Sequence, residues 1–541
     1  MTVADLTSVL VETLEAVLGV SGATPETSFF SAGGTSLHAE IYARTASAAT
    51  GRTITFTDIF RHPSPQDLAD ALTTRADGAD TTGTAEAEAS TRWRPVSENQ
   101  ASRLERLRLA EQSGRPAFRA HAELLLAGFD LRGPLDVDAL DAAVHAVVTR
   151  HSALRTRFRI SDEGYAQQVE PASYGLEPVD ARHLHPAEVL DLAWRPLDLR
   201  SGRLARFLLA DFGEDHHQLW VTVEHIVSDG VSCHVLNNAL ADEYSRRATG
   251  TAEPAPAPAP TPVPAPAPSG DIEGHDFARL ENALCQDAQG RAAEEHWRRQ
   301  IGDGPIWRPY AHPDLAGPGQ DRAAGDVLLV RTRPAATGRA LRERAAQYGT
   351  TLHALVVFAL TRAAARAAAT RDVTVYWYTA NRNLPGVATT VGSLAGLTMA
   401  RVAPVPHGRG EAEIRAVART VADSMAYAFH PIERIARQHT TQWLMPDDEP
   451  FLVLHVNEDT QTPEPSGARE PLRFAGLHVA AADGYGRRDR RGYTLDASVT
   501  SLPSGFSLGL SYRDGMIPAA AAARLLEGFA EEIDRIVEGA P

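Results

Sequence analysis

The sequence predicts a small helical bundle followed by a larger α/β unit built in two lobes. Two breaks in composition divide the 541 residues. The first, at 76–92, is small, acidic and polar, which is typical of a linker. The second, at 254–270, is rich in proline and favours a stiff polyproline II segment, either between two domains or as a loop within one. Apolar residues recur at helix spacing before the first break, and strands alternate with helices after it.

Residues 1–75 are expected to form the bundle. The first helix is indicated by an apolar stripe made of Leu6, Val9, Leu10, Leu14, Val17 and Leu18. A second helix is expected from Leu37 to about Ala49. A third begins near Ser64, where the serine can cap the helix and Pro65 takes its first position. Three or four short helices in about 75 residues make a small bundle.

Residues 93–541 are expected to hold both strands and helices. The first half predicts a strand at Ala122–Leu131, a helix at Leu135–His151, a hairpin made of ARFLLADF and QLWVTVEH, and a helix from about Val231 to Arg247. The second half predicts helices between Thr337 and Ala369, the strand VTVYWYT, strands near Phe451, Tyr493 and Phe506, and a final helix from Ala519 to Val537. This order predicts two α/β lobes rather than eight regular βα units.

Charge and cysteine content exclude several classes of function. The net charge is −16 and the pI is about 5.7, whereas tight nucleic-acid binding needs clustered positive charge. The one dense basic cluster, Arg487, Arg488, Arg490 and Arg491, is interpreted as a solvated loop. Cys233 and Cys285 are too few for a disulfide framework, and no C-x-x-C spacing suggests zinc. We therefore expect no nucleic-acid partner and no metal.

The N-terminal segment does not have the pattern of a signal peptide. It is acidic and amphipathic, and it lacks a basic region followed by a long apolar one. No stretch approaches 18 consecutive apolar residues, so no membrane span is expected. The sequence predicts a soluble protein of the cytoplasm.

The first candidate site is Ser36, in the stretch TSFFSAGGTSLHAE. Two glycines precede it and a predicted helix follows it. Glycines allow a partner to approach the backbone closely, and the free N–H groups of a helix N-terminus favour a phosphate. From the motif alone, a simple helix cap is the better interpretation.

The second candidate site is the stretch EHIVSDG, which includes His225, Asp229 and Gly230. His225 stands where a strand leaves the sheet, a position suited to meeting a ligand, and its ring titrates near neutrality. Gly230 allows a tight turn whose N–H group faces the reacting centre. Asp229 is expected to orient that turn through an ion pair. A core histidine with a satisfied hydrogen bond is the alternative for His225.

Residues 3–75 resemble the thiolation, or peptidyl carrier, domain of nonribosomal peptide synthetases. The resemblance depends on the GGTSL motif, on Phe29 and Phe30 before it, and on TDIFRHPSPQDLADAL after it. It implies that Ser36 carries 4'-phosphopantetheine, whose thiol holds an aminoacyl or peptidyl group. Ser36 is then both the helix cap and the attachment point.

Residues 93–539 resemble the condensation domain of the same synthetases. Besides EHIVSDG, four stretches match in order: SENQASRL (Ser97–Leu104), RHSALRTRF (Arg150–Phe158), GHDFARLEN (Gly274–Asn282) and FHPIERI (Phe429–Ile435). The resemblance implies a two-lobed, chloramphenicol-acetyltransferase-like fold with the reaction in a tunnel between the lobes. It makes His225 the active-site histidine and places the proline-rich segment 254–270 in an internal loop.

Three departures from the family pattern stand out. The first histidine of the usual His-His pair is Glu224, and the only such pair in the chain, His216–His217, falls in the hairpin turn region. Gly396 aligns with an asparagine of the family, so a pocket hydrogen bond is missing or supplied elsewhere. Arg382, in TANRN, matches the arginine that pairs with the motif aspartate, which implies an ion pair with Asp229.

The resemblance implies an acyl transfer in which the carrier thioester on Ser36 donates to an amine or hydroxyl, forming an amide or ester. Epimerisation is one alternative, although its usual Glu-Gly-His-Gly-Arg-Glu stretch is replaced here by YWYTANRNLPG. A degenerate domain that serves as a docking platform is another, suggested by Glu224 and Gly396. The expected partners are a phosphopantetheinyl transferase, an adenylation enzyme acting in trans or an upstream module, and an acceptor on another carrier or as a soluble amine or alcohol.

Overall fold

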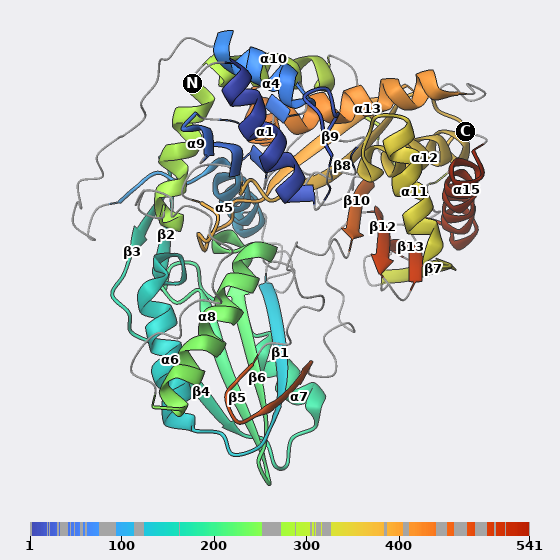
Figure 1. Ribbon diagram of the computed structural model, residues 1–541. Coiled ribbons are helices and arrows are strands. Elements are labelled where there is room, and N and C mark those ends of the chain that lie inside the picture. Colours follow the sequence, from blue (N-terminus) through green and yellow to red (C-terminus); the bar gives the residue numbers. More distant parts are fainter. Residues whose placement is uncertain are drawn as a thin grey trace.

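The computed structural model describes most of residues 3–539 (Figure 1). The residues outside the description are 1–2, 19, 21, 30–31, 33–41, 44, 48, 53, 55–57, 60–61, 75–92, 113–123, 162, 251–271, 287, 303–305, 308, 310–314, 316–325, 383–386, 404–409, 440–451, 459–472, 482–494, 503–504, 514–515 and 540–541. The linker 76–92, the proline-rich segment 254–270 and the cluster Arg487–Arg491 therefore lie outside the described residues. Phe30, Ser36 and Leu37 do so as well.

The N-terminal segment forms the helical bundle that the sequence predicts. Its helices include α1 (Val3–Leu18) and α4 (Pro65–Thr74), and residues 42–43, 45–47 and 49–50 are also helical. The apolar stripe of α1 is buried in a core that contains Phe29 and Tyr42. The Ser64 hydroxyl accepts a hydrogen bond from the Asp67 N–H group at 3.1 Å, so Ser64 caps α4 as expected.

The first lobe is built on a five-stranded sheet in the order β11-β1-β6-β5-β4. Its strands are β1 (Leu124–Arg132), β4 (Leu176–Asp180), β5 (Ala205–Gly213), β6 (His216–Glu224) and β11 (His478–Ala481). The predicted hairpin is confirmed, because β5 and β6 pair in antiparallel register. Around the sheet lie α6 (Val137–Arg150), α7 (Pro186–Ala193), α8 (Gly230–Ala248) and a ribbon of β2 (Thr156–Ser161) and β3 (Gly164–Val169), which follows the 3-10 turn η2 (Ser152–Arg155).

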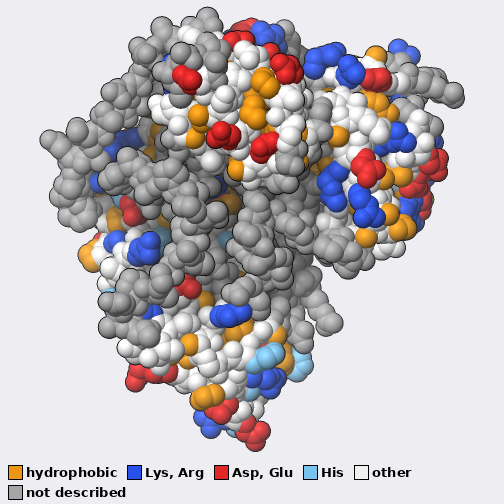
Figure 2. Space-filling view, viewed as in Figure 1, with side chains coloured by type: hydrophobic (Ala, Val, Ile, Leu, Met, Phe, Trp, Pro, Cys, Tyr) orange, Lys and Arg blue, Asp and Glu red, His pale blue; other side chains and the backbone are white. Residues whose placement is uncertain are grey.

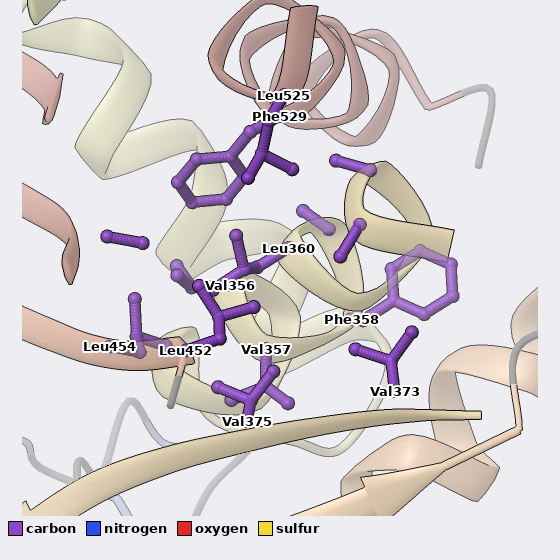
Figure 3. Packing of buried hydrophobic residues seen from close by; sticks show 14 of the residues in the cluster. Val356, Val357, Phe358, Leu360, Val373, Val375, Leu452, Leu454, Leu525 and Phe529 are labelled. Atoms are coloured by element: carbon purple, nitrogen blue, oxygen red, sulfur yellow. The ribbon is translucent and has the colours of Figure 1, made fainter. Parts of the chain in front are cut away.

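The second lobe is built on a six-stranded sheet in the order β7-β13-β12-β10-β8-β9. Its strands are β7 (Asp326–Arg333), β8 (Val373–Thr379), β9 (Gly396–Val402), β10 (Leu452–Glu458), β12 (Leu495–Leu502) and β13 (Gly505–Arg513). One face packs against α11 (Ala336–Gln347), α12 (Leu352–Ala367), α13 (Glu411–Ala426) and α15 (Ala519–Glu538). Figure 3 shows this core, where side chains of α12 and α15 meet Val373, Val375, Leu452 and Leu454 of the sheet.

The opposite face of the second sheet packs against α10 (Ala288–Ile301) and α14 (Ile432–His439). Alternate strand residues, such as Tyr376 and Val453, point to this side because successive side chains of a strand face opposite ways. On the surface shown in Figure 2, acidic and basic side chains are interspersed. No helix in the described parts of the chain is long and apolar enough to cross a membrane.

Three segments connect the parts of the molecule. Strand β11 pairs with β1 in the sheet of the first lobe, although the strands before and after it in the sequence, β10 and β12, belong to the second lobe. Helix α5 (Glu98–Gln112) contacts α14 and the short turn His225–Val227 that precedes α8. Helix α9 (Phe277–Gln286), which follows the turn η4 (Gly274–Asp276), is joined to the start of α5 by a hydrogen bond from the Glu98 N–H group to Glu281. Met425 of α13 packs against the core of the N-terminal bundle, so the bundle rests on the second lobe.

Candidate active site

His225 begins a short 3-10 turn, η3 (His225–Val227), at the end of β6. Its Nδ1 atom lies 2.9 Å from the backbone oxygen of Ser228. A carbonyl oxygen can only accept, so in the neutral ring Nδ1 carries the proton and Nε2 is the basic nitrogen. The turn therefore selects the tautomer that can accept a proton at Nε2.

The Asp229 side chain is buried, and groups of the protein bind its oxygens. It is only 1% exposed, and its oxygens lie 2.7 and 2.8 Å from Nη2 of Arg382, which is 7% exposed. Oδ1 also accepts from the N–H and O–H groups of Ser232, both at 2.8 Å. Oδ2 accepts from the N–H groups of Leu394 and Ala395 at 3.1 and 3.2 Å. The structure thus brings Asp229 and Arg382 together as a buried ion pair between the lobes.

Gly230 is the first residue of α8, five positions after His225 in the sequence. It is exposed, whereas the four residues before it are buried. A Cβ atom added to Gly230 would find no heavy atom within 4 Å. The first N–H groups of a helix have no partner inside the helix. A reacting group therefore has room to approach the start of α8 at Gly230.

Glu224 and the His216–His217 pair do not share the position of His225. Glu224 is 5% exposed, and its backbone oxygen accepts from the Ser228 hydroxyl at 2.8 Å. His216 and His217 are the first residues of β6 and directly follow the turn Glu214–Asp215, so they lie in the hairpin turn region, as the sequence predicts. They are at the opposite end of that strand from His225. His216 Nε2 lies 2.8 Å from Asp130 Oδ2, which gives it a structural partner.

Asn381 occupies the space that an asparagine at position 396 would need. Its Nδ2 atom would lie 2.7 Å from a Cβ added to Gly396. Its side chain donates to the Leu394 oxygen at 3.0 Å and accepts from the Thr379 hydroxyl at 3.1 Å. Asn381 has φ +51°, a conformation that asparagine adopts more readily than most residues. The amide that the family's asparagine would supply at position 396 is therefore supplied by Asn381, from the loop after β8.

We expect Gly396→Asn to destabilise the protein by about 1–3 kcal/mol, because its Cβ overlaps the Asn381 amide. The exchange variant Asn381→Gly/Gly396→Asn should recover most of that loss, since glycine suits the positive φ at 381. A double-mutant cycle from denaturant unfolding measures the coupling. Additive effects of the two substitutions would show that the side chains do not share this space.

Some residues of the site were not singled out by the sequence. Gln100, at the start of α5, donates from Nε2 to the Ile226 oxygen at 3.3 Å and so supports the His225 turn. The neighbouring Asn99 donates to Ser393 Oγ and to the Ala395 oxygen, both at 3.1 Å. Both belong to the SENQASRL motif, and the position of this motif at the start of a helix was the sequence signal that could have identified them.

Ser36 lies outside the described residues, and the bundle around it bears on its role. Phe29 and Tyr42 stand on either side of its segment, and their rings stack with centroids 5.3 Å apart. A serine hydroxyl offers the oxygen that a phosphodiester to 4'-phosphopantetheine requires.

Comparison with known families agrees with the two parts of the chain. A family model described as "Condensation domain" matches residues 121–540, which is more than half of the chain. A second model, described as "Phosphopantetheine attachment site", matches residues 8–72. That attachment site is where 4'-phosphopantetheine is covalently bound.

Relatives and solved structures agree with this assignment. Nonribosomal peptide synthetase kk1B of Curvularia clavata is 29% identical over 443 residues, and Tyrocidine synthase 3 of Brevibacillus parabrevis is 26% identical over 443. These matches cover 80% and 81% of this chain but 3% and 6% of the relatives, so the chain spans a small part of their length.

The solved structures show the fold. The first condensation domain of the calcium-dependent antibiotic synthetase has a TM-score of 0.61 at 18% identity, covering 84% of this chain and 98% of that one. The X-domain from teicoplanin biosynthesis gives 0.66 at 20%, covering 82% and 95%. The epimerization domain from the third module of tyrocidine synthetase B gives 0.60 at 16%, covering 83% and 96%. The predicted two-lobed, chloramphenicol-acetyltransferase-like fold is confirmed, and the chain belongs to the condensation-domain family of nonribosomal peptide synthetases, with a phosphopantetheine carrier domain ahead of it.

Proposed function

We propose that the chain transfers an acyl group from a thioester on its own carrier domain to an amine or hydroxyl, forming an amide or an ester. The observation that carries the proposal is the geometry at the end of β6. His225 is fixed by Ser228 with Nε2 as the basic nitrogen, beside the open N-terminus of α8 at Gly230. In this proposal residues 1–75 are the carrier, 76–92 the linker, and 93–541 the condensation domain with an internal loop at 254–270.

When attached to Ser36, phosphopantetheine supplies a long flexible arm that ends in the acyl thioester. A phosphopantetheinyl transferase would attach it, and an adenylation enzyme or an upstream module would load it. The acceptor is either bound to another carrier or a soluble amine or alcohol.

His225 would receive the proton of the nucleophile at Nε2 while the nucleophile bonds to the carbonyl carbon. The carbon–sulfur bond then breaks, and the sulfur leaves as a thiol with that proton, so charge is balanced. N–H groups at the start of α8, including that of Gly230, would stabilise the negative charge on the carbonyl oxygen. Asp229 and Arg382 would hold the loop that aligns these groups and would not themselves transfer protons.

The test is intact-protein mass spectrometry of the acylated protein. Ser36 is loaded with an acyl-phosphopantetheine by a transferase, and Ser36→Ala is the loading control. The loaded protein is then challenged with free amines, alcohols and aminoacyl carriers. Loss of the acyl mass with formation of the matching amide or ester supports the proposal and identifies the acceptor class.

We expect His225→Ala to slow this transfer by at least about 100-fold, the usual contribution of a general acid–base group. Gln100→Ala is a useful comparison, because it removes a support of the same turn while leaving the His225 ring. Equal rates for His225→Ala and the wild type would contradict the proposed role of His225, and equal rates at the uncatalysed level would favour a docking platform. Acyl retention with deuterium exchange at the acyl α-carbon would favour epimerisation.

A further inference from the structure

One methionine joins the core of the N-terminal bundle to the core of the second lobe. The bundle's core is formed by apolar residues of α1 and α4 together with Phe29 and Tyr42. Among the described residues that follow the linker, Met425 of α13 is the one apolar side chain that packs against this core (Figure 1). The same side chain packs against the large core of the second lobe. Met425 therefore fills a contact between two separate hydrophobic cores.

The sulfur atom of Met425 has a defined hydrogen-bond partner. Nε1 of Trp377, a residue of β8 that is 3% exposed, donates to the Met425 sulfur at 3.1 Å. The Trp377 ring is packed edge-on against the ring of His353, with centroids 4.9 Å apart. Methionine is a flexible side chain and its thioether is a weak acceptor. The bond from a buried indole therefore limits the directions in which the Met425 side chain can turn.

Met425 differs from the other methionines that the structure describes in its exposure. Met399 of β9 is fully buried and Met516 is 9% exposed, whereas Met425 is partly exposed. Met1 and Met445 lie outside the described residues. Exposure controls how readily a thioether is oxidised, because the oxidant must reach the sulfur. A hydroperoxide should therefore react with Met425 before it reacts with Met399 or Met516.

We propose that Met425 is an oxidation-sensitive anchor of the bundle, and that a hydroperoxide converts it to methionine sulfoxide and releases the bundle from α13. In this step a lone pair of the sulfur attacks one peroxide oxygen, so that an S–O bond forms and the O–O bond breaks. With hydrogen peroxide, the second oxygen leaves as water after the proton has been transferred to it. The sulfur loses an electron pair and the peroxide gains it. The inference does not depend on the proposed acyl transfer, because it concerns how the carrier is held.

The oxidised side chain does not suit the contact that Met425 makes. Oxidation turns an apolar side chain into a polar one, and a polar group buried against an apolar surface without a hydrogen bond is unfavourable. The side that faces Trp377 has little room for another oxygen, because Nε1 already lies 3.1 Å from the sulfur. The side chain must therefore turn, which changes the surface that it presents to the bundle. Release of the bundle exposes the new oxygen to water, which supplies its hydrogen bonds.

The test measures NMR relaxation of the backbone amides of α1 in the isotope-labelled full chain, before and after treatment with hydrogen peroxide. A bundle held on α13 tumbles with the whole chain, whereas a released bundle moves more independently. We expect the transverse relaxation times of α1 to lengthen at least about twofold on oxidation. Peptide mass mapping should show that Met425 gains an oxygen before Met399 and Met516 do. Methionine sulfoxide reductase should reverse both changes.

Three variants separate the anchor from general oxidation of the protein. Met425→Leu keeps an apolar side chain of similar volume and removes the sulfur, so its bundle should stay held and should not respond to peroxide. Met425→Gln places a polar amide at the contact, and should lengthen the α1 relaxation times at least about twofold without any oxidant. Met516→Leu is the matched control. It removes a methionine that packs in the core of the second lobe, and should respond to peroxide as the wild type does.

Three results would overturn the inference. The first is that the α1 relaxation times stay the same when Met425 is fully oxidised. The second is that Met425→Leu responds to peroxide as the wild type does, because the release would then come from another residue. The third is that Met425→Gln and the untreated wild type have the same relaxation times, because the bundle would then not be held through this contact. The amide chemical shifts of α1 show in each sample that the bundle itself remains folded.

Discussion

Replacing Asp229 with alanine should lower the free energy of unfolding by about 3–5 kcal/mol, the usual effect of removing one partner from a buried ion pair. The substitution leaves the Arg382 guanidinium buried without its counter-ion. It also leaves the N–H groups of Ser232, Leu394 and Ala395 without the acceptor that they share. The N-terminus of α8 loses its cap, and the contact between the lobes at this point is lost.

Arg382→Met should be less destabilising than Asp229→Ala. The Asp229 carboxylate would keep four donors, which are the N–H and O–H groups of Ser232 and the N–H groups of Leu394 and Ala395. Arg382 also donates to the backbone oxygens of Val387 and Thr390, so its loss loosens the 387–390 loop. Acyl transfer should fall in both variants, because in the proposed reaction this loop and the start of α8 position the reacting groups.

Denaturant unfolding followed by tryptophan fluorescence measures both effects, and hydrogen exchange at the start of α8 locates them. Arg331→Met is the matched control, because it removes an arginine that pairs with Glu527 on the exposed surface. That variant should change stability by less than about 1 kcal/mol. A larger loss for Arg382→Met than for Asp229→Ala would show that the backbone donors do not hold the carboxylate.

Glu281→Gln should stabilise the protein relative to wild type as the pH rises, whereas Glu532→Gln should destabilise it. The two glutamates are both buried, with exposures of 5% and 1%. They differ in their partners. Glu532 accepts from Arg366 and Arg535 and lies 3.4 Å from Arg362 Nε, while Glu281 has no arginine partner among the described residues.

The sign follows from the pKa of Glu281, which burial and then Glu433 raise to about 8 from a usual value of 4.5. Between these two values the folded protein holds a proton that the unfolded chain has released, so stability falls as the pH rises. The expected contribution of Glu281 is about −1.4 kcal/mol per pH unit, and this contribution is absent in Glu281→Gln. Unfolding experiments at pH 5.5, 6.5 and 7.5 on the wild type and this variant measure the difference.

Glu532→Gln should cost about 3 kcal/mol, because it leaves three arginines beside a neutral amide. The same substitution therefore has opposite effects at the two sites. If the wild type and Glu281→Gln lose stability in parallel from pH 5.5 to 7.5, Glu281 does not hold a proton in the folded protein over this range.

Much of the fold could be predicted because its elements have strong local signals. The hairpin of β5 and β6, the helices α8, α12 and α15, and the strand β8 all have periodic apolar patterns and lie close to the predicted boundaries. The short or polar elements were not predicted. Helix α5 (ENQASRLERLRLAEQ) has few apolar residues, and it is held by contacts to residues far along the chain.

The site could be predicted in part. His225, Asp229 and Gly230 are adjacent in the chain, so a linear motif can identify them. The pairing of Asp229 with Arg382 followed from a family resemblance, and in the structure it spans 153 residues. Asn381 was not identified. Its role depends on its side chain lying beside Gly396 in the folded chain, and a linear pattern does not contain this contact.

The sequence by itself determined the order of domains, the carrier motif at Ser36, and the histidine and glycine of the turn after β6, because these depend on residues close together in the chain. Only the tertiary structure decided what surrounds them. It brings β11 to the first lobe, joins the lobes through Asp229 and Arg382, and places Glu281 beside Glu433 although they are far apart in sequence. The physical reason is that burial and electrostatic partners are set by packing between distant segments, and these partners determine how a carboxyl group or an imidazole ring behaves.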